Sequence, residues 1–226
     1  MWMCCTMLTV QEMFDLSHTR AAKLLESVTY AWEALGSIGE TIRQLGPTLD
    51  PEKYDHPQEE VWIAKSAKIA PTVSITGPCI IGENTEVRQC AFIRGNALVG
   101  DGCVVGNSTE LKNVILFDDV QVPHYNYVGD SILGCRSHMG AGSITSNVKS
   151  DKGMVIIKNG DERMETGRKK VGAMLADDVE IGCGSVLNPG TVVGKGSRVY
   201  PLTSVRGVIP AGYICKQNGE LVHIHE

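Results

Sequence analysis

The sequence has few aromatic residues, no long apolar run and no secretion signal. Only 5% of its 226 residues are aromatic, and no uninterrupted apolar stretch reaches the roughly 20 residues of a membrane-spanning helix. The first residues lack the basic segment and cleavage site of a signal peptide, which predicts a cytoplasmic protein that does not enter membranes. A formal net charge of −5 offers no general attraction to phosphate backbones, so nucleic-acid binding is not expected.

Metal-ligand spacing is also missing from the sequence. None of the eight cysteines forms a C-x-x-C pair, so reduced and mostly packed thiols are favoured over disulfides or structural zinc. His223 and His225 could ligate a metal from one side of a terminal strand, but an exposed strand is the simpler interpretation. The zinc site of a γ-type carbonic anhydrase needs three converging histidines, and residues 59–215 contain only His124 and His138. No metal site is therefore predicted.

The sequence does contain a strict six-residue repeat. Aliphatic residues follow one another at this interval in two runs: Ile63, Ile69, Ile75, Ile81, Val87, Ile93, Val99, Val105 and Leu111, then Leu175, Ile181, Leu187, Val193, Val199 and Val205. A helix would repeat its apolar face every three to four residues and a half-buried strand every two. Six residues fit one short strand and a tight corner, often followed by a small residue such as Gly106 or Gly182. Three such units predict coils of about eighteen residues that stack at the parallel-strand spacing of about 4.8 Å.

This pattern resembles the hexapeptide-repeat family, whose fold is the left-handed parallel β-helix. The resemblance implies a mainly β, trimeric solenoid over residues 59–215, with an inserted loop at about 148–171 and a C-terminal tail over 216–226. Residues 1–58 are expected to form a short helical segment and linker, which either caps the open first coil or bridges to a partner.

Local signals support helices before the repeat. Thr9 and Glu12 have the spacing of a capping box. Apolar residues recur at helical intervals from Ser17 to about Leu45, where Gly46-Pro47 closes the segment.

The register between the two aliphatic runs is imperfect. Phe117 and Pro123 keep the six-residue step, the chain then slips, and Leu133 and Met139 resume it. Irregularity inside a solenoid often marks a loop on its working face.

Two basic residues occupy equivalent corner positions. Arg94 and Lys112 are eighteen residues apart, so a three-sided coil would stack one above the other. They are either solvated side chains that diverge or a phosphate clamp, for which arginine offers a bidentate fork and lysine a point charge. His124 falls on a different corner and is either a surface histidine or a general base. A local loop or a neighbouring subunit would have to bring the two corners together.

Four segments sharpen the resemblance: Phe92–Asn96, Asn107–Lys112, Pro123–Asp130 and Gly140–Asn147. They are similar to the acetyltransferase domain of the bifunctional glucosamine-1-phosphate acetyltransferases that are also N-acetylglucosamine-1-phosphate uridyltransferases. Gly167–Ala173, with its long insertion, looks more like the archaeal-type fused sugar-phosphate nucleotidyltransferase–acetyltransferases. The resemblance implies transfer of acetyl from acetyl-CoA to the amino group of a glucosamine-1-phosphate-like amino-sugar phosphate, in nucleotide-sugar biosynthesis.

The resemblance also implies roles for the residues that match on the acceptor side. His124 would be the general base that deprotonates the attacking amino group. Arg94 and Lys112 would hold the phosphate or nucleotide end of the acceptor. Tyr127 and Asn147 would orient the amino sugar.

On the donor side, the backbone N–H of Ala141 would support the acetyl carbonyl, and acetyl-CoA would lie near Cys183 and Pro201. Some positions depart from the bacterial pattern. His138 stands where an asparagine usually contacts the sugar, Val148 replaces a tyrosine, and Cys183 replaces a serine. These departures leave the acceptor open, with His138 expected among the residues that bind it.

The Gly-rich start of a nucleotidyltransferase domain is absent from the sequence, so uridyl transfer is not expected of this chain. A separate nucleotidyltransferase is an expected partner. The alternative function is a non-catalytic solenoid that binds a sugar nucleotide or acts as a partner subunit of that enzyme. The altered His138 and Val148 favour this alternative. The presence of His124, Arg94 and Lys112 together favours the enzyme. The basic run Arg168–Lys170 is interpreted as a solvated loop or as a contact for a CoA phosphate.

Overall fold

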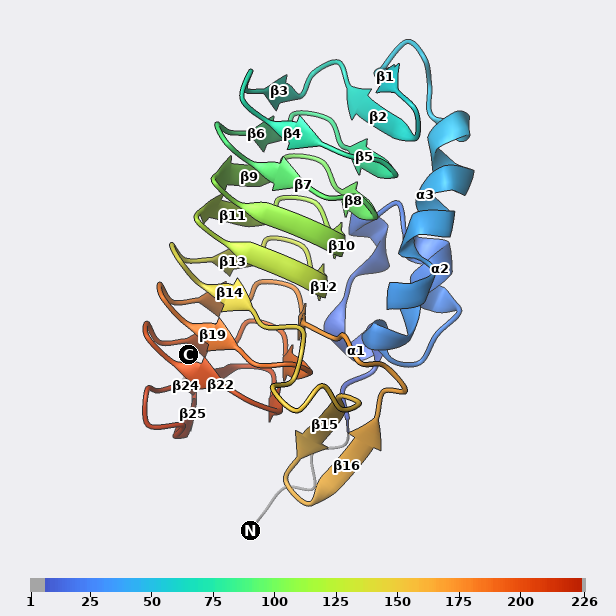
Figure 1. Cartoon of the computed structure of the whole chain (residues 1–226). Coiled ribbons are helices and arrows are strands. Elements are labelled where there is room, and N and C mark those ends of the chain that lie inside the picture. Colours follow the sequence, from blue (N-terminus) through green and yellow to red (C-terminus); the bar gives the residue numbers. More distant parts are fainter. Residues whose placement is uncertain (1–6, 225–226) are drawn as a thin grey trace.

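The chain winds into a three-sided coil of parallel strands. A computed structural model describes residues 7–224 and places the first coil at the top of Figure 1. Strands at the front run from left to right, and the chain returns behind them as it descends, so the coil is left-handed (Figure 1). The predicted fold class, a mainly β left-handed parallel β-helix, is confirmed.

Each side of the coil is a stack of short strands. The first side contains β2 (Val61–Ala64), β5 (Cys79–Ile81), β8 (Ala97–Val99), the second halves of β10 (Glu110–Leu116) and β12 (Tyr127–Leu133), β17 (Ala173–Leu175), β20 (Thr191–Val193) and β23 (Val208–Ile209). The second side contains β3 (Lys68–Ile69), β6 (Glu86–Val87), β9 (Val104–Asn107), β11 (Gln121–His124), β13 (His138–Met139), β18 (Glu180–Ile181), β21 (Arg198–Val199) and β24 (Tyr213–Cys215). The third side contains β4 (Ser74–Ile75), β7 (Phe92–Ile93), the first halves of β10 and β12, β14 (Ile144–Thr145), β19 (Val186–Leu187) and β22 (Ser204–Val205).

The six-residue repeat fills the interior of the coil. Ile81 pairs with Val99, and Ile93 pairs with Leu111, each eighteen residues further on. The repeat residues from Ile81 onward are buried, whereas Ile63 in the first coil is only partly so. Glycine is required at crowded corners: a Cβ at Gly106 would collide with the Pro123 carbonyl of the next coil.

The register slips earlier than the sequence pattern predicts. Leu116 and Val122 pair with the inward residues of the preceding coil and fill the interior. The prediction that Phe117 and Pro123 keep the step is therefore wrong by one position. Phe117 instead packs against Phe14 of the N-terminal segment, with ring centroids 4.9 Å apart.

The slip arises because β10 and β12 each continue without interruption from the third side to the first side. One residue with positive φ turns each strand, Asn113 (φ 56°) in β10 and Asp130 (φ 49°) at the equivalent place in β12, and short polar side chains tolerate this conformation. In these two coils the corner between the third and first sides is therefore one residue shorter than in the coils before them. Leu133 and Met139 resume the inward register as predicted, paired with strands β17 and β18.

The N-terminal segment consists of short elements: α1 (Val10–Met13), η1 (Leu16–His18), α2 (Ala22–Glu26), η2 (Ala31–Gly36), α3 (Ile38–Leu45), η3 (Gly46–Thr48) and β1 (Tyr54–Gln58). The predicted capping box of Thr9 and Glu12 is present. The expected helical stretch is interrupted at the β-branched pair Val28-Thr29 and at Gly36, residues that lower helix propensity. No helix among the described residues is long and apolar enough to cross a membrane.

These helices lie along the first side rather than over the end of the coil (Figure 1). Helix α3 contacts β5, β8 and β10, and η2 contacts β12. At the first coil, β1 pairs with β2 in antiparallel orientation, and Gly46 of η3 packs against Trp62 of β2.

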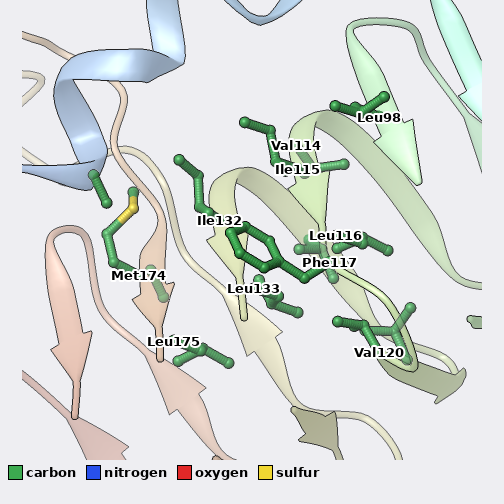
Figure 2. Packing of buried hydrophobic residues seen from close by; sticks show 14 of the residues in the cluster. Leu98, Val114, Ile115, Leu116, Phe117, Val120, Ile132, Leu133, Met174 and Leu175 are labelled. Carbon is green, nitrogen blue, oxygen red and sulfur yellow. The ribbon is translucent and has the colours of Figure 1, made fainter. Parts of the chain in front are cut away.

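The first side carries an outward stripe of apolar side chains that these elements cover. Its members are almost completely buried: Ile80, Leu98, Ile115, Ile132, Met174 and Val192. Figure 2 shows Ile115 and Ile132 on the side of their strands that faces the N-terminal helices, with Leu133 on the opposite side. Burying each such side chain contributes about 1.5–3 kcal/mol. The solenoid therefore has a second core outside its coil.

The inserted segment extends this cover to the later coils. Strands β15 (Ile156–Asn159) and β16 (Glu162–Glu165) form an antiparallel hairpin. Val155 and Ile157 are buried and pack against Gly190, next to β20. After β24 the chain turns back, and β25 (Leu221–His223) pairs with it in antiparallel orientation. His225 lies outside the described residues.

Aspartates at the corner between the first and second sides hold the N-terminal segment in place. Asp101 forms a 2.9 Å ion pair with Arg20, and Asp177 accepts a 2.7 Å hydrogen bond from the backbone N–H of Asp15. Each aspartate also accepts a backbone N–H from the solenoid. The N-terminal segment is thus joined to the coil by polar contacts as well as by the apolar stripe.

Candidate functional site

His124, Ala141, Cys183 and Pro201 form one column at the corner between the second and third sides, which we call the His124 corner. The carbonyls of the first three each accept a backbone hydrogen bond of 2.9–3.0 Å from the following coil. The residues that the resemblance associates with the base and the acetyl donor therefore lie in sequence along one edge of the solenoid.

A buried amide fixes the geometry of this edge. Asn126 accepts a 3.1 Å hydrogen bond from the His124 backbone N–H and donates to the carbonyls of Gly140 at 2.9 Å and Ser143 at 3.0 Å. Because its side chain connects two coils, His124 and Ala141 are held at a fixed separation. The sequence analysis did not identify Asn126.

The groups that could do chemistry at this corner are exposed. The imidazole of His124 and the thiol of Cys183 both face solvent. The Ala141 N–H makes no backbone hydrogen bond within residues 7–224, so it can donate to a ligand. Asn107, one coil before His124, has a buried Oδ1 that lacks a hydrogen-bond partner among the described residues.

Arg94 and Lys112 lie one above the other at the next corner, between the third and first sides, which we call the Lys112 corner. Their neighbours Ile93 and Leu111 pair directly, and the Arg94 N–H donates to the Leu111 carbonyl at 2.8 Å. The spacing of eighteen residues therefore gives the stacked arrangement that it predicts.

Each of these cations has a carboxylate partner that the sequence analysis missed. Arg94 Nη1 lies 2.7 Å from Glu110 Oε1, and Lys112 Nζ lies 3.0 Å from Asp130 Oδ1. The Arg94 pair is substantially exposed, whereas Asp130 is only 5% exposed. Within each pair the positive and negative charges cancel, so the stack alone offers no net positive charge to a phosphate.

Asp130 is the centre of a polar network. Besides Lys112, it accepts hydrogen bonds from Asn113 Nδ2 at 3.0 Å and from Asn147 Nδ2 at 2.5 Å. Asn113 also donates to the Leu35 carbonyl of η2 at 3.2 Å. A buried carboxylate needs such partners, and here they connect three coils and the N-terminal helices.

Tyr127 borders this network. Its hydroxyl accepts a 3.1 Å hydrogen bond from Asn147 Nδ2, and its ring lies over Gly129, where a Cβ would collide with the phenol oxygen. Burial raises the pKa of Tyr127, and the charges of Asp130 and Glu110 raise it further. The hydroxyl therefore stays protonated and keeps one hydrogen to donate to a ligand.

The raised pKa of Tyr127 predicts a phenol that ionises above the ordinary value of about 10. Below the ordinary pKa, the neutral phenol makes its full contribution to the stability of the folded state. This contribution is lost as the pH rises through the folded-state pKa. A spectrophotometric titration of Tyr127→Phe should lose part of the late tyrosinate signal, and Tyr54, whose pKa burial also raises, should supply the rest. The same change at the exposed Tyr125 should leave the late signal unchanged. An identical late signal in both variants would contradict the buried position of Tyr127.

His138 lies apart from both corners, on the second side. Its Nδ1 is 2.8 Å from Glu180 Oε2 of the adjacent strand. At the far end of the His124 corner, Tyr200 and Pro201 border a shallow pocket of about 520 Å³ with Lys216. One of the predicted donor residues, Pro201, therefore borders a hollow.

The structure does not bring the two corners together within one chain. The first half of β12 separates His124 from Gly129, which lies beside Lys112. Five extended residues span about 16 Å. A substrate that reaches both corners of one chain would have to cross the third side.

Charge complementarity on adjacent coils could have revealed the missed carboxylates. Asp130 follows Lys112 by eighteen residues, and Glu110 lies two residues before Lys112 on the same strand. The role of Asn126 had no comparable signal, because its contacts depend on the shape of the turn.

Four of the six cysteines that the structure describes are packed, whereas Cys90 and Cys183 are exposed. Burial raises the pKa of Cys79 to about 12 and that of Cys135 to about 11. Within residues 7–224, no group of three histidine, cysteine or acidic side chains is placed to hold a metal ion. Cys4 and Cys5 lie outside the described residues.

Comparison with known families identifies a relationship over the centre of the solenoid. A family model described as the GMPPB C-terminal domain matches residues 75–195. The chain is 35% identical over 152 residues to the bifunctional protein GlmU of Methanococcus maripaludis, a match that covers 59% of the chain and 37% of the relative. It is 30% identical over 159 residues to a bifunctional sugar-1-phosphate nucleotidylyltransferase/acetyltransferase of Sulfurisphaera tokodaii, covering 62% and 40%. The chain thus spans about two fifths of these relatives.

Solved structures also resemble the chain at lower identity. A UDP-N-acetylglucosamine acyltransferase of Francisella novicida is 15% identical, with a TM-score of 0.48 over 73% of the chain and 66% of that structure. A GDP-perosamine N-acetyltransferase of Caulobacter crescentus is 16% identical, with a TM-score of 0.35 over 72% and 56%.

Proposed function

Because the chain belongs to the GMPPB C-terminal domain family, we propose that it transfers an acetyl group from acetyl-CoA to the amino group of an amino-sugar phosphate. The observation that carries this proposal is the column at the His124 corner. An exposed imidazole, a free backbone N–H and the predicted donor residues follow one another there on consecutive coils.

The proposed chemistry uses two groups of this corner. The neutral amino nitrogen attacks the thioester carbonyl carbon, and the imidazole of His124 accepts the proton that the nitrogen gives up. The Ala141 N–H donates to the oxygen on which negative charge develops. The intermediate then collapses, the C–S bond breaks, and the CoA thiolate leaves and takes up a proton. Acetyl-CoA would extend along the column past Cys183 towards Pro201.

The Lys112 corner would hold the acceptor. Lys112 and Arg94 supply cationic hydrogen-bond donors, Tyr127 supplies a hydroxyl, and Asn147 keeps that hydroxyl in place. His138 would contact the sugar from the second side. The buried Asp130 would orient Lys112 and Asn147 through its contacts with both side chains.

A homotrimer would complete this site. The first side is already covered by the chain's own helices and hairpin, so its second and third sides are the ones left for neighbouring copies. In a closed cyclic assembly, the His124 corner of one copy can face the Lys112 corner of the next. This arrangement removes the need for a substrate to cross the third side of one chain.

The pairing of the two cations favours a second candidate function. With Arg94 bound to Glu110 and Lys112 bound to Asp130, the solenoid could bind a sugar nucleotide without catalysis, or act with a separate nucleotidyltransferase. Acetyl transfer by the purified chain separates the two candidates.

The experiment is an assay of thiol release from acetyl-CoA in the presence of glucosamine-1-phosphate or galactosamine-1-phosphate. We expect release that depends on one of these amino sugars and a product acetylated at nitrogen, identified by mass. The corresponding N-acetylated sugars serve as controls because they have no free amine. Thiol release that stays at the rate of spontaneous hydrolysis with both amino sugars would contradict the proposal.

A further inference from the structure

The Lys112 corner is more basic than its two stacked cations indicate. The inserted segment returns to the coil at this corner through the run Arg168–Lys170, directly before β17. We call the resulting group of five cations the basic corner: Arg94, Lys112, Arg168, Lys169 and Lys170.

Hydrogen bonds connect the inserted run to the Asp130 network. The Val171 N–H donates to the Asn147 carbonyl at 3.0 Å, and Asn147 in turn binds Asp130. Arg168 Nη2 donates to the Glu33 carbonyl of η2 at 3.1 Å. Asn113, the neighbour of Lys112 in β10, binds η2 two residues further on, so the inserted run and β10 both contact this short helix.

The charges of this corner do not cancel. Glu110 and Asp130 neutralise Arg94 and Lys112. Counting the carboxylate of Glu33 as well, five cations face three anions, which leaves a net charge of +2 on a chain whose net charge is −5. Lys169 and Lys170 are exposed and have no carboxylate partner within residues 7–224.

The basic corner is longer than one phosphate. Gly129 separates Lys112 from Val171, so the paired and unpaired cations are two coil steps, or about 10 Å, apart. Two linked phosphates extend further along this direction than a single phosphoryl group and bring more negative charge towards both sets of cations.

We propose that the basic corner binds the diphosphate of a nucleotide-linked amino sugar, and that this is the preferred acceptor over a sugar monophosphate. The inference rests on the proposed acetyl transfer for its biological meaning, but the anion site is defined independently of it. Lys169 and Lys170 act as point charges towards the second phosphate, while Lys112 contacts the first.

CoA also contains a diphosphate. Within one chain, the donor column of Ala141, Cys183 and Pro201 lies at the His124 corner, one full side of the coil away from Lys169 and Lys170. In the proposed trimer the His124 corner of a neighbouring copy faces the basic corner, so the acceptor and the donor are distinguished by the kinetic comparison below.

Calorimetric titration of the full chain with inorganic phosphate and with pyrophosphate, without divalent cations and at equal ionic strength, tests the anion site directly. We expect pyrophosphate to bind at least tenfold more tightly. The double variant Lys169→Gln/Lys170→Gln should weaken pyrophosphate binding at least tenfold and change phosphate binding less than twofold. The matched control Lys23→Gln/Lys68→Gln removes two exposed lysines from α2 and β3, with the same loss of charge, and should keep the affinity within twofold.

Equal affinities for the two anions, or an equal loss of pyrophosphate binding in the two double variants, would overturn the proposal. A kinetic comparison separates acceptor from donor: the Lys169→Gln/Lys170→Gln variant should raise the KM for UDP-glucosamine at least fivefold and leave that for acetyl-CoA unchanged. A rise confined to acetyl-CoA would assign the run to the donor and overturn the inference. Selective pyrophosphate binding without any acetyl transfer would uphold the anion site and contradict the proposed function alone.

Discussion

Replacing His124 with alanine should lower kcat for acetyl transfer at least a hundredfold. A positioned general base contributes about 10²–10⁴-fold to a rate, and no other histidine lies on the His124 corner column among the described residues. The imidazole is exposed and makes no side-chain contact that the fold depends on, so the folded state should survive the change. Single-turnover measurement of N-acetylated product would report the chemical step.

The matched control is His56→Ala, which removes an exposed histidine from β1 at the first coil, where it stacks on Trp62. This variant should keep at least half of the rate. His124→Gln should behave like the alanine variant, because an amide can form hydrogen bonds but cannot accept the proton at neutral pH. If His124→Ala retains most of the activity while both variants stay folded, the base must be another group and the column loses its proposed meaning.

The six-residue repeat predicted the fold because its residues occupy equivalent inward positions in successive strands. Inward positions such as Ile81 and Val99 must be aliphatic, since each packs on its counterpart in the next coil. The same arithmetic placed Arg94 above Lys112. It failed at Phe117, because a single residue with positive φ at Asn113 shortens one corner, and the hydrophobic pattern cannot distinguish Leu116 from Phe117 when both are apolar.

The missed parts of the site share a different cause. Asp130 and Asn126 act through partners that are far away in the sequence, and their buried contacts appear only when the coils are stacked. The association of Arg168 with η2 joins residues 135 positions apart. Spacing within one element cannot reveal such contacts. It did reveal the capping box, because Thr9 and Glu12 are only three residues apart.

The outward apolar stripe leads to the second large expected effect. Ile132→Ala should lower the free energy of unfolding by about 2–5 kcal/mol, the usual cost of truncating a fully buried aliphatic side chain. Ile132 points out of the coil, so this cost arises only if the N-terminal helices cover the first side in solution. Leu133→Ala, which removes the neighbouring inward side chain, should cost a similar amount.

The control is Gln121→Ala, an equally outward position on the second side, where the side chain is exposed and the change should stay within about 0.5 kcal/mol. Urea unfolding followed by circular dichroism gives all three values from the midpoints, provided that the denaturant slope is unchanged. If Ile132→Ala behaved like Gln121→Ala while Leu133→Ala remained costly, the coil would be intact but its first side uncovered. The first side would then be open to neighbouring copies, and the argument that reserves the second and third sides for trimer contacts would no longer hold.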